Sequence, residues 1–126
     1  MSSKTAVVVL SDPSTGTEEA LGRVFNALAT AWEFAQGGEA LVLFQGAGTR
    51  WPAVLSEPEH PAHELYAAVK EKVVTVASGG CATVFGATEG VEVADVKQVS
   101  QNQAPGTPGV ASIRELVLSG YHVLTF

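Results

Sequence analysis

The chain has 126 residues, of which 46% are hydrophobic and 16% are charged, a composition typical of one packed domain and unlike that of disordered proteins. Thirteen acidic residues against seven basic ones give a formal net charge of −6, which excludes the usual footprint of a nucleic-acid binder and disfavours a membrane surface as partner. The sequence offers no apolar stretch long enough to span a bilayer, and its first residues are polar. We therefore expect a single cytoplasmic domain over residues 1–126.

The first half of the chain predicts a strand, a helix and a second strand. Residues 4–10 form an apolar run rich in β-branched side chains, as in strands that are covered on both faces. Apolar residues then recur at helical spacing over 17–36, and Thr15 with Glu18 fits a capping box at the start of this helix. The buried-strand pattern returns over residues 39–45.

The second half continues this alternation after an irregular stretch. A helix is predicted over 61–72, with Pro61 in its first turn, and a third strand over 73–77. The later predicted elements are a helix through about residue 92 that Gly86 and Gly90 interrupt, a strand over 96–100, a helix over 110–119 and a strand over 121–126. Because strands and helices alternate throughout, we expect a parallel sheet with helices on both faces.

The single cysteine of the chain follows the third predicted strand. Ligands of open parallel sheets bind outside the carboxyl ends of the strands, and Cys81 lies at such an end, where a helix begins. Free backbone N–H groups at a helix start stabilise a thiolate, and Gly79 and Gly80 leave room for a substrate to approach. The alternative is that Cys81 is a small buried hydrophobic residue. A disulfide within the chain is impossible.

Four more residues near strand ends are candidates for substrate binding. Asp12 and Gln45 follow the first and second strands, although Asp12 also fits a simple turn. The segment 46–50 is either a backbone nest for an anion, with Arg50 as charge partner, or a plain turn, which is the favoured interpretation. Trp51 either covers the pocket or covers an oligomer interface.

A metal site is not expected. His60 and His63 lie among three glutamates, but they flank the start of a helix, where a solvated acidic face is the simpler interpretation. A Ser/His/Asp arrangement for hydrolysis cannot be assembled from the spacing either.

Six segments spread over almost the entire chain resemble the DsrE family. They are residues 4–10, 22–28, 46–51, 63–66 and 81–86, together with the ending formed by 112–114 and 120–126. The resemblance implies a three-layer α/β/α fold with a five-stranded parallel sheet, flavodoxin-like in architecture, as in DsrE, DsrF and TusD-like proteins, and homo-oligomeric assembly. It also implies a strand-end cysteine that carries sulfur as a persulfide in the sulfur-relay members, and Cys81 matches it. Proteins with these motifs often have a second cysteine three positions earlier. This chain has Ser78 there, which excludes a dithiol mechanism.

Two functions follow as expectations. The first is a persulfide carrier that exchanges sulfur at Cys81 with a donor or acceptor protein and requires no metal or organic cofactor. The alternative is a non-catalytic homo-oligomeric module that binds a small ligand in a strand-end crevice lined by Trp51 and Phe85, with Cys81 packed.

Overall fold

The computed structural model describes residues 2–126, and these residues form one five-stranded sheet. The strands are β1 (Lys4–Val9), β2 (Glu39–Phe44), β3 (Val74–Ser78), β4 (Lys97–Val99) and β5 (His122–Thr125). They lie in the order β4-β3-β2-β1-β5, and each neighbouring pair is parallel. The predicted five-stranded parallel sheet is therefore confirmed.

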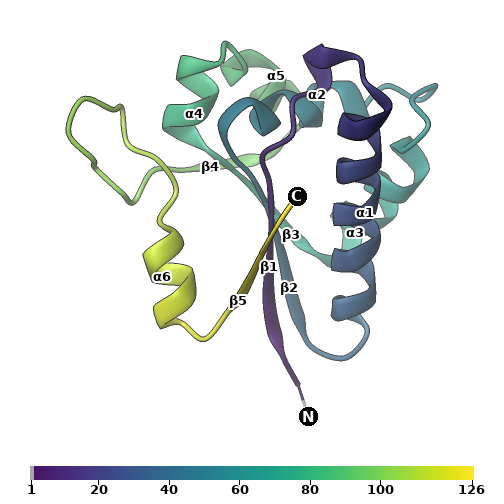
Figure 1. The fold of residues 1–126 in the computed structure, drawn as a ribbon, viewed down its shortest axis with the longest axis horizontal. Coiled ribbons are helices and arrows are strands. Elements are labelled where there is room, and N and C mark those ends of the chain that lie inside the picture. The colour runs from purple at the N-terminus through teal and green to yellow at the C-terminus, as the bar shows by residue number, and fades with distance from the viewer. Residues whose placement is uncertain (1) are drawn as a thin grey trace.

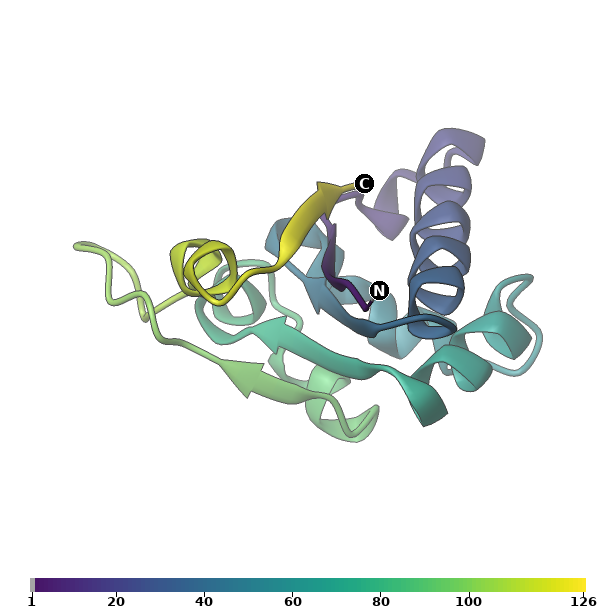
Figure 2. The same ribbon diagram turned by 90° about the horizontal axis from the view of Figure 1, so that it is seen from below.

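Helices cover both faces of this sheet. They are α1 (Glu18–Ala35), α2 (Trp51–Leu55), α3 (His63–Lys72), α4 (Gly79–Val84), α5 (Thr88–Val93) and α6 (Ile113–Leu118), with two 3₁₀ helices, η1 (Pro13–Thr15) and η2 (Gly46–Arg50). Figure 1 shows α1 and α3 beside the sheet, and the turned view of Figure 2 places α6 on the opposite face. The three-layer α/β/α architecture is confirmed. Within residues 2–126, no helix combines the length and the apolar character that crossing a bilayer requires.

Alternate residues of the central strands supply two hydrophobic cores. Val7 and Phe44 belong to the larger core, which contains the buried side of α1. Val8 and Leu43 belong to a smaller core on the α6 side. Burial on both faces explains why the strands read as continuous apolar runs rather than as alternating patterns.

The start of α1 differs from the prediction. Thr17 caps this helix, because its hydroxyl oxygen accepts a hydrogen bond of 3.1 Å from the backbone N–H of Ala20. Thr15 instead ends η1, and Gly16 reverses the chain with a φ of 65° before the helix begins. The capping box predicted from Thr15 and Glu18 is therefore wrong.

Two further boundaries are corrected, and a third prediction is confirmed in part. The stretch predicted as irregular after β2 contains η2 and α2. The next helix, α3, begins at His63, so Pro61 precedes it rather than lying in its first turn. The interruption predicted at Gly86 is confirmed, because its φ of 67° divides the helix into α4 and α5. The interruption predicted at Gly90 is wrong, since Gly90 lies within α5.

Candidate functional site

Cys81 lies at the carboxyl edge of the sheet, three residues after the end of β3. It is the third residue of α4, and its side chain is partly exposed. Val84 and Phe85 follow it three and four residues later, at the spacing that brings side chains to the same side of a helix. Both are exposed, at 68% and 37% respectively. A partly exposed cysteine and the exposed Val84 thus belong to α4, and Phe85 ends this helix, where the Arg50 guanidinium lies 5.5 Å from its ring.

The two glycines before Cys81 are packing positions. A methyl group added to Gly79 would collide with the side chain of Ser100, and one added to Gly80 would collide with the carbonyl group of Gly109. The backbone N–H of Gly80 donates a hydrogen bond of 2.7 Å to that carbonyl oxygen. The expectation that these glycines leave room for a substrate is therefore corrected, since the segment 100–109 occupies the space.

Ser78, the last residue of β3, is hydrogen-bonded to the chain just beyond the segment 100–109. It is fully buried, and its hydroxyl oxygen accepts a hydrogen bond of 3.0 Å from the backbone N–H of Ala111. Ser78 therefore has a structural role in this chain.

Arg50 and Asp12 bind each other. The guanidinium Nη1 lies 3.0 Å from Asp12 Oδ2, and the Nε–H donates to the carbonyl oxygen of Phe85 at 3.2 Å. Hydrogen bonds from Ser14 lower the pKa of Asp12, and the ion pair with Arg50 lowers it further. This pair connects the end of β1 to the end of α4.

The segment 46–50 forms η2 rather than a nest for an anion. The N–H of Gly48 donates to the carbonyl oxygen of Gln45 at 2.9 Å, and the hydroxyl of Thr49 donates to Gly46 at 2.8 Å. With Arg50 engaged by Asp12, the favoured interpretation of this segment as a turn is the one that agrees with the structure.

Trp51 belongs to the core, and both roles predicted for it are wrong. Its side chain is only 2% exposed, and its indole N–H donates a hydrogen bond of 2.8 Å to the backbone oxygen of Ser11. The predicted crevice lined by Trp51 and Phe85 therefore cannot form around this indole.

His60 and His63 are each engaged with a nearby backbone group through their Nδ1 atoms. The Nδ1 atom of His60 accepts a hydrogen bond from the N–H of Ala62 at 3.1 Å, and Nδ1 of His63 lies 2.8 Å from the oxygen of Leu55. Among residues 2–126, no group of three His, Cys, Asp or Glu side chains is arranged to hold a metal ion.

Gln45 lies apart from the other candidates. It lines a cavity of about 390 Å³ with the segment 101–103 and the residues that lead into α6, and Cys81 does not line this cavity. The predicted site residues therefore divide among three places: α4 with its glycines, the Asp12–Arg50 pair beside Trp51, and the Gln45 cavity.

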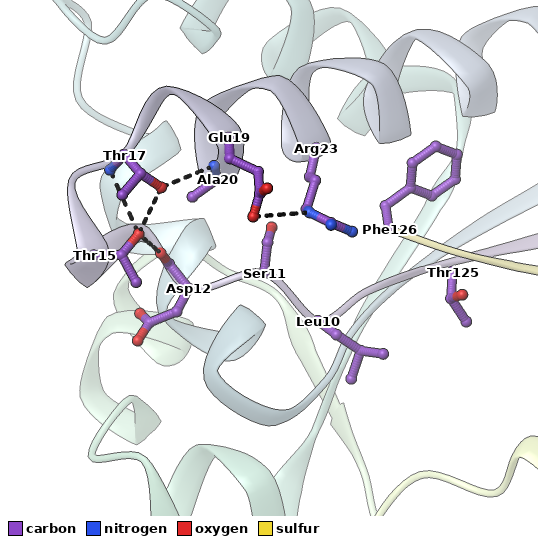
Figure 3. A pocket seen from close by; sticks show the side chains of 10 residues that line it. All are labelled: Leu10, Ser11, Asp12, Thr15, Thr17, Glu19, Ala20, Arg23, Thr125 and Phe126. Carbon is purple, nitrogen blue, oxygen red and sulfur yellow. Dashed lines mark hydrogen bonds and ion pairs between the residues drawn. The ribbon is translucent and has the colours of Figure 1, made fainter.

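A further cleft was not predicted. It lies between α1 and the ends of β1 and β5, and its lining includes Asp12, Arg23 and Phe126 (Figure 3). The residues themselves carry no motif. The signal that identifies the cleft is the position of β5 beside β1, which comes from the sheet order.

Comparisons with known proteins support the fold. Neither the protein-family models nor the curated proteins include a match to this chain. A solved structure of a conserved protein of unknown function from Bacteroides thetaiotaomicron is similar, with a TM-score of 0.56 and 12% sequence identity. The similarity covers 98% of this chain and 94% of that one. At this level of identity it establishes the shared fold alone.

Proposed function

We propose that this protein is a DsrE-like, thiol-based sulfur carrier that accepts and passes on a sulfane sulfur at Cys81. The observation that carries the proposal is the partly exposed side chain of this single cysteine, at the carboxyl edge of a parallel sheet. A reagent or partner can reach such a thiol without unfolding the domain. The motifs that resemble the DsrE family support the same assignment.

The surroundings of Cys81 suit exchange with another protein. A carrier must bring its sulfur against the thiol of a donor and later against that of an acceptor, so it needs a contact surface around the cysteine. The exposed Val84 of α4 and Phe85, which directly follows this helix, provide apolar area close to Cys81 in the chain. Apolar residues around a reactive atom exclude water while two proteins are in contact.

The chemistry is a balanced exchange of one sulfur atom. The Cys81 thiolate attacks the outer sulfur of a donor persulfide, a new S–S bond forms, and the donor S–S bond breaks. The donor leaves as a thiol that carries the proton lost by Cys81, and Cys81 becomes a persulfide. An acceptor thiolate then attacks the outer sulfur in the same way and releases the Cys81 thiolate. Neither step changes the total number of electrons, and neither requires a metal or an organic cofactor.

Assembly and location complete this proposal. The protein acts as a homo-oligomer, supported by Val117 and Leu118 of α6, which are 56% and 71% exposed. A cytoplasmic location suits it, because thiols stay reduced there. Light scattering should give a particle larger than one chain, and Leu118→Glu should shift it toward the monomer. A wild-type monomer at micromolar concentration would contradict the assembly.

Intact mass spectrometry tests the carrier function. After exposure to a small persulfide donor, we expect the wild type to gain one sulfur atom and Cys81→Ser to gain none. Val84→Glu is the matched surface variant: it should accept sulfur from the small donor as the wild type does, but should exchange it more slowly with a protein thiol. If the wild type gains no sulfur and the folded protein is alkylated slowly, the thiol is packed, and the small-ligand module becomes the better hypothesis.

A further inference from the structure

The strand order of the sheet creates a crevice away from Cys81. From β1 the chain moves in one direction across the sheet, through β2 and β3 to β4, and β5 then returns to the other side of β1. The pair β1 and β5 is thus the topological switch point. In open parallel sheets, ligands bind outside the carboxyl ends of the strands, at the switch point of the strand order.

Helices on opposite faces of the sheet flank this pair of strands. The helix α1 follows β1 and packs against β1 and β2, whereas α6 precedes β5 and packs against it from the other face. A cavity of about 430 Å³ lies between α1 and the ends of β1 and β5. Small-molecule sites commonly have volumes of about 300 to 1,000 Å³, so this space is large enough for a small metabolite.

Part of the cleft lining is apolar. Leu10 is 48% exposed, although it directly follows the most buried strand of the sheet, and Ala20 and Phe126 line the same space. A ligand with an apolar body would cover this area.

Among residues 2–126, Arg23 is the one positively charged side chain that lines the cleft. Its side chain extends from α1 toward Phe126 (Figure 3). Its only ion pair within residues 2–126 is with Glu19, with 3.9 Å between Nε and Oε1, and both side chains are more than half exposed. Such a pair contributes little free energy, so a ligand carboxylate can replace Glu19 at small cost. A guanidinium can then hold that carboxylate through two N–H groups.

The remaining charged and polar side chains narrow the ligand class. Asp12 is held by Ser14 and Arg50 at 3.0 Å or less, so it is not free to bind a cation. The Ser11 hydroxyl oxygen accepts from the Trp51 indole at 3.2 Å, and within residues 2–126 its own O–H donates to no protein atom, so it can donate to a ligand. Arg23 is the single cation that lines the cleft, which suits a monoanion better than a polyphosphate.

From these observations we infer that the β1–β5 cleft binds a small organic monoanion. Its carboxylate or sulfonate group pairs with Arg23, Ser11 donates a hydrogen bond to it, and its apolar body lies on Leu10, Ala20 and Phe126. This site is separate from Cys81 and does not depend on the proposed carrier function.

Proton–nitrogen NMR titration with phenylacetate tests the inference. We expect phenylacetate to shift the backbone amide signals of residues 10–23 and 124–126, and benzyl alcohol to bind at least about fivefold more weakly because it lacks the charge. Arg23→Gln should abolish this preference. Glu19→Gln should strengthen phenylacetate binding about twofold to fivefold, because it removes the competing carboxylate.

Matched controls separate this site from the rest of the molecule. Arg114→Gln changes an exposed arginine at α6 on the opposite face and should leave phenylacetate binding unchanged. Cys81→Ser should also leave it unchanged, so failure here and failure of the carrier function are distinguishable. The inference is overturned if phenylacetate shifts other regions or none, if Arg23→Gln binds it as the wild type does, or if adenosine triphosphate binds the cleft more tightly than phenylacetate.

Discussion

Replacing Gly80 with alanine should destabilise the fold rather than block a substrate. The added Cβ would overlap the carbonyl group of Gly109 and would lie 3.0 Å from a methyl group of Val110. Both neighbours belong to the long segment between β4 and α6. This segment must move away from α4, and the hydrogen bond of 2.7 Å from the Gly80 N–H to Gly109 must lengthen or break.

The magnitude follows from three contributions. Overpacking a tight contact costs about 1 to 3 kcal/mol, and weakening one backbone hydrogen bond costs about 1 kcal/mol. Alanine in place of glycine within a helix stabilises the folded state by about 0.5 to 1 kcal/mol, which offsets part of this loss. The net loss for Gly80→Ala is about 1 to 3 kcal/mol, which for a chain of this length lowers Tm by about 4 to 12 °C.

Gly22→Ala is the matched control. Gly22 lies inside α1, and a Cβ at this position meets no atom within 4 Å. The same chemical change should therefore raise the free energy of unfolding by about 0.5 to 1 kcal/mol. Thermal unfolding followed by far-UV circular dichroism measures both variants, and alkylation of Cys81 in the folded state is measured alongside. If Gly80→Ala melts with the wild type but its thiol reacts much more slowly, the space at Gly80 serves a ligand and the reasoning is refuted.

Two further predictions concern titrating groups. Hydrogen bonds from the side chain and the backbone N–H of Ser14 lower the pKa of Asp12, and so does Arg50. Ser14→Ala and Arg50→Gln should therefore each raise this pKa, as measured by carboxyl-carbon NMR, and a variant that leaves it unchanged would contradict the assignment of that contact. The stability from the lowered pKa is present above pH 3.8 and is lost as the pH falls through the folded-state value. Burial raises the pKa of Tyr66 from 10.0 to about 12, so the fold favours the neutral phenol, and the stability this gives is present below pH 10 and is lost as the pH rises toward 12. Within residues 2–126 the Tyr66 hydroxyl has no hydrogen-bond partner, so Tyr66→Phe should match or exceed the wild-type stability at neutral pH and should flatten this alkaline loss in denaturant titrations; a clear loss of stability at neutral pH would show that the hydroxyl is paired.

Secondary structure was predictable wherever burial on both faces left a continuous apolar run. The prediction matched β1 and β2 to within one residue, since the predicted ranges were 4–10 and 39–45. It succeeded because Val7, Val8 and Val9 are all buried, whichever face of the sheet they point to. Position at the carboxyl edge was predictable for Cys81 for the same reason, since it depends only on the end of a strand.

Side-chain partners were not predictable from the same patterns. Arg50 and Trp51 follow a glycine-rich segment, which looks like a ligand loop in the sequence. Their partners, Asp12 and Ser11, lie about forty residues earlier and come close only because β1 and β2 are adjacent. The polar groups that suggested a binding site are therefore used to join the two strand ends.

The cleft at β1 and β5 depends on a single fact of topology. The alternation of strands and helices is equally compatible with β5 beside β4, and in that arrangement β1 would be an edge strand and Arg23 would have no strand end opposite it. The structure places Thr5 to Val8 of β1 beside His122 to Thr125 of β5, and the hydrogen bonds from Phe126 to Val8 and from Leu10 to Phe126 extend this pairing to the cleft. This one pairing makes β5 the edge strand and forms the switch point. A substitution that loosens β5 should therefore weaken the binding of an organic anion at Arg23 more than it changes the reactivity of Cys81.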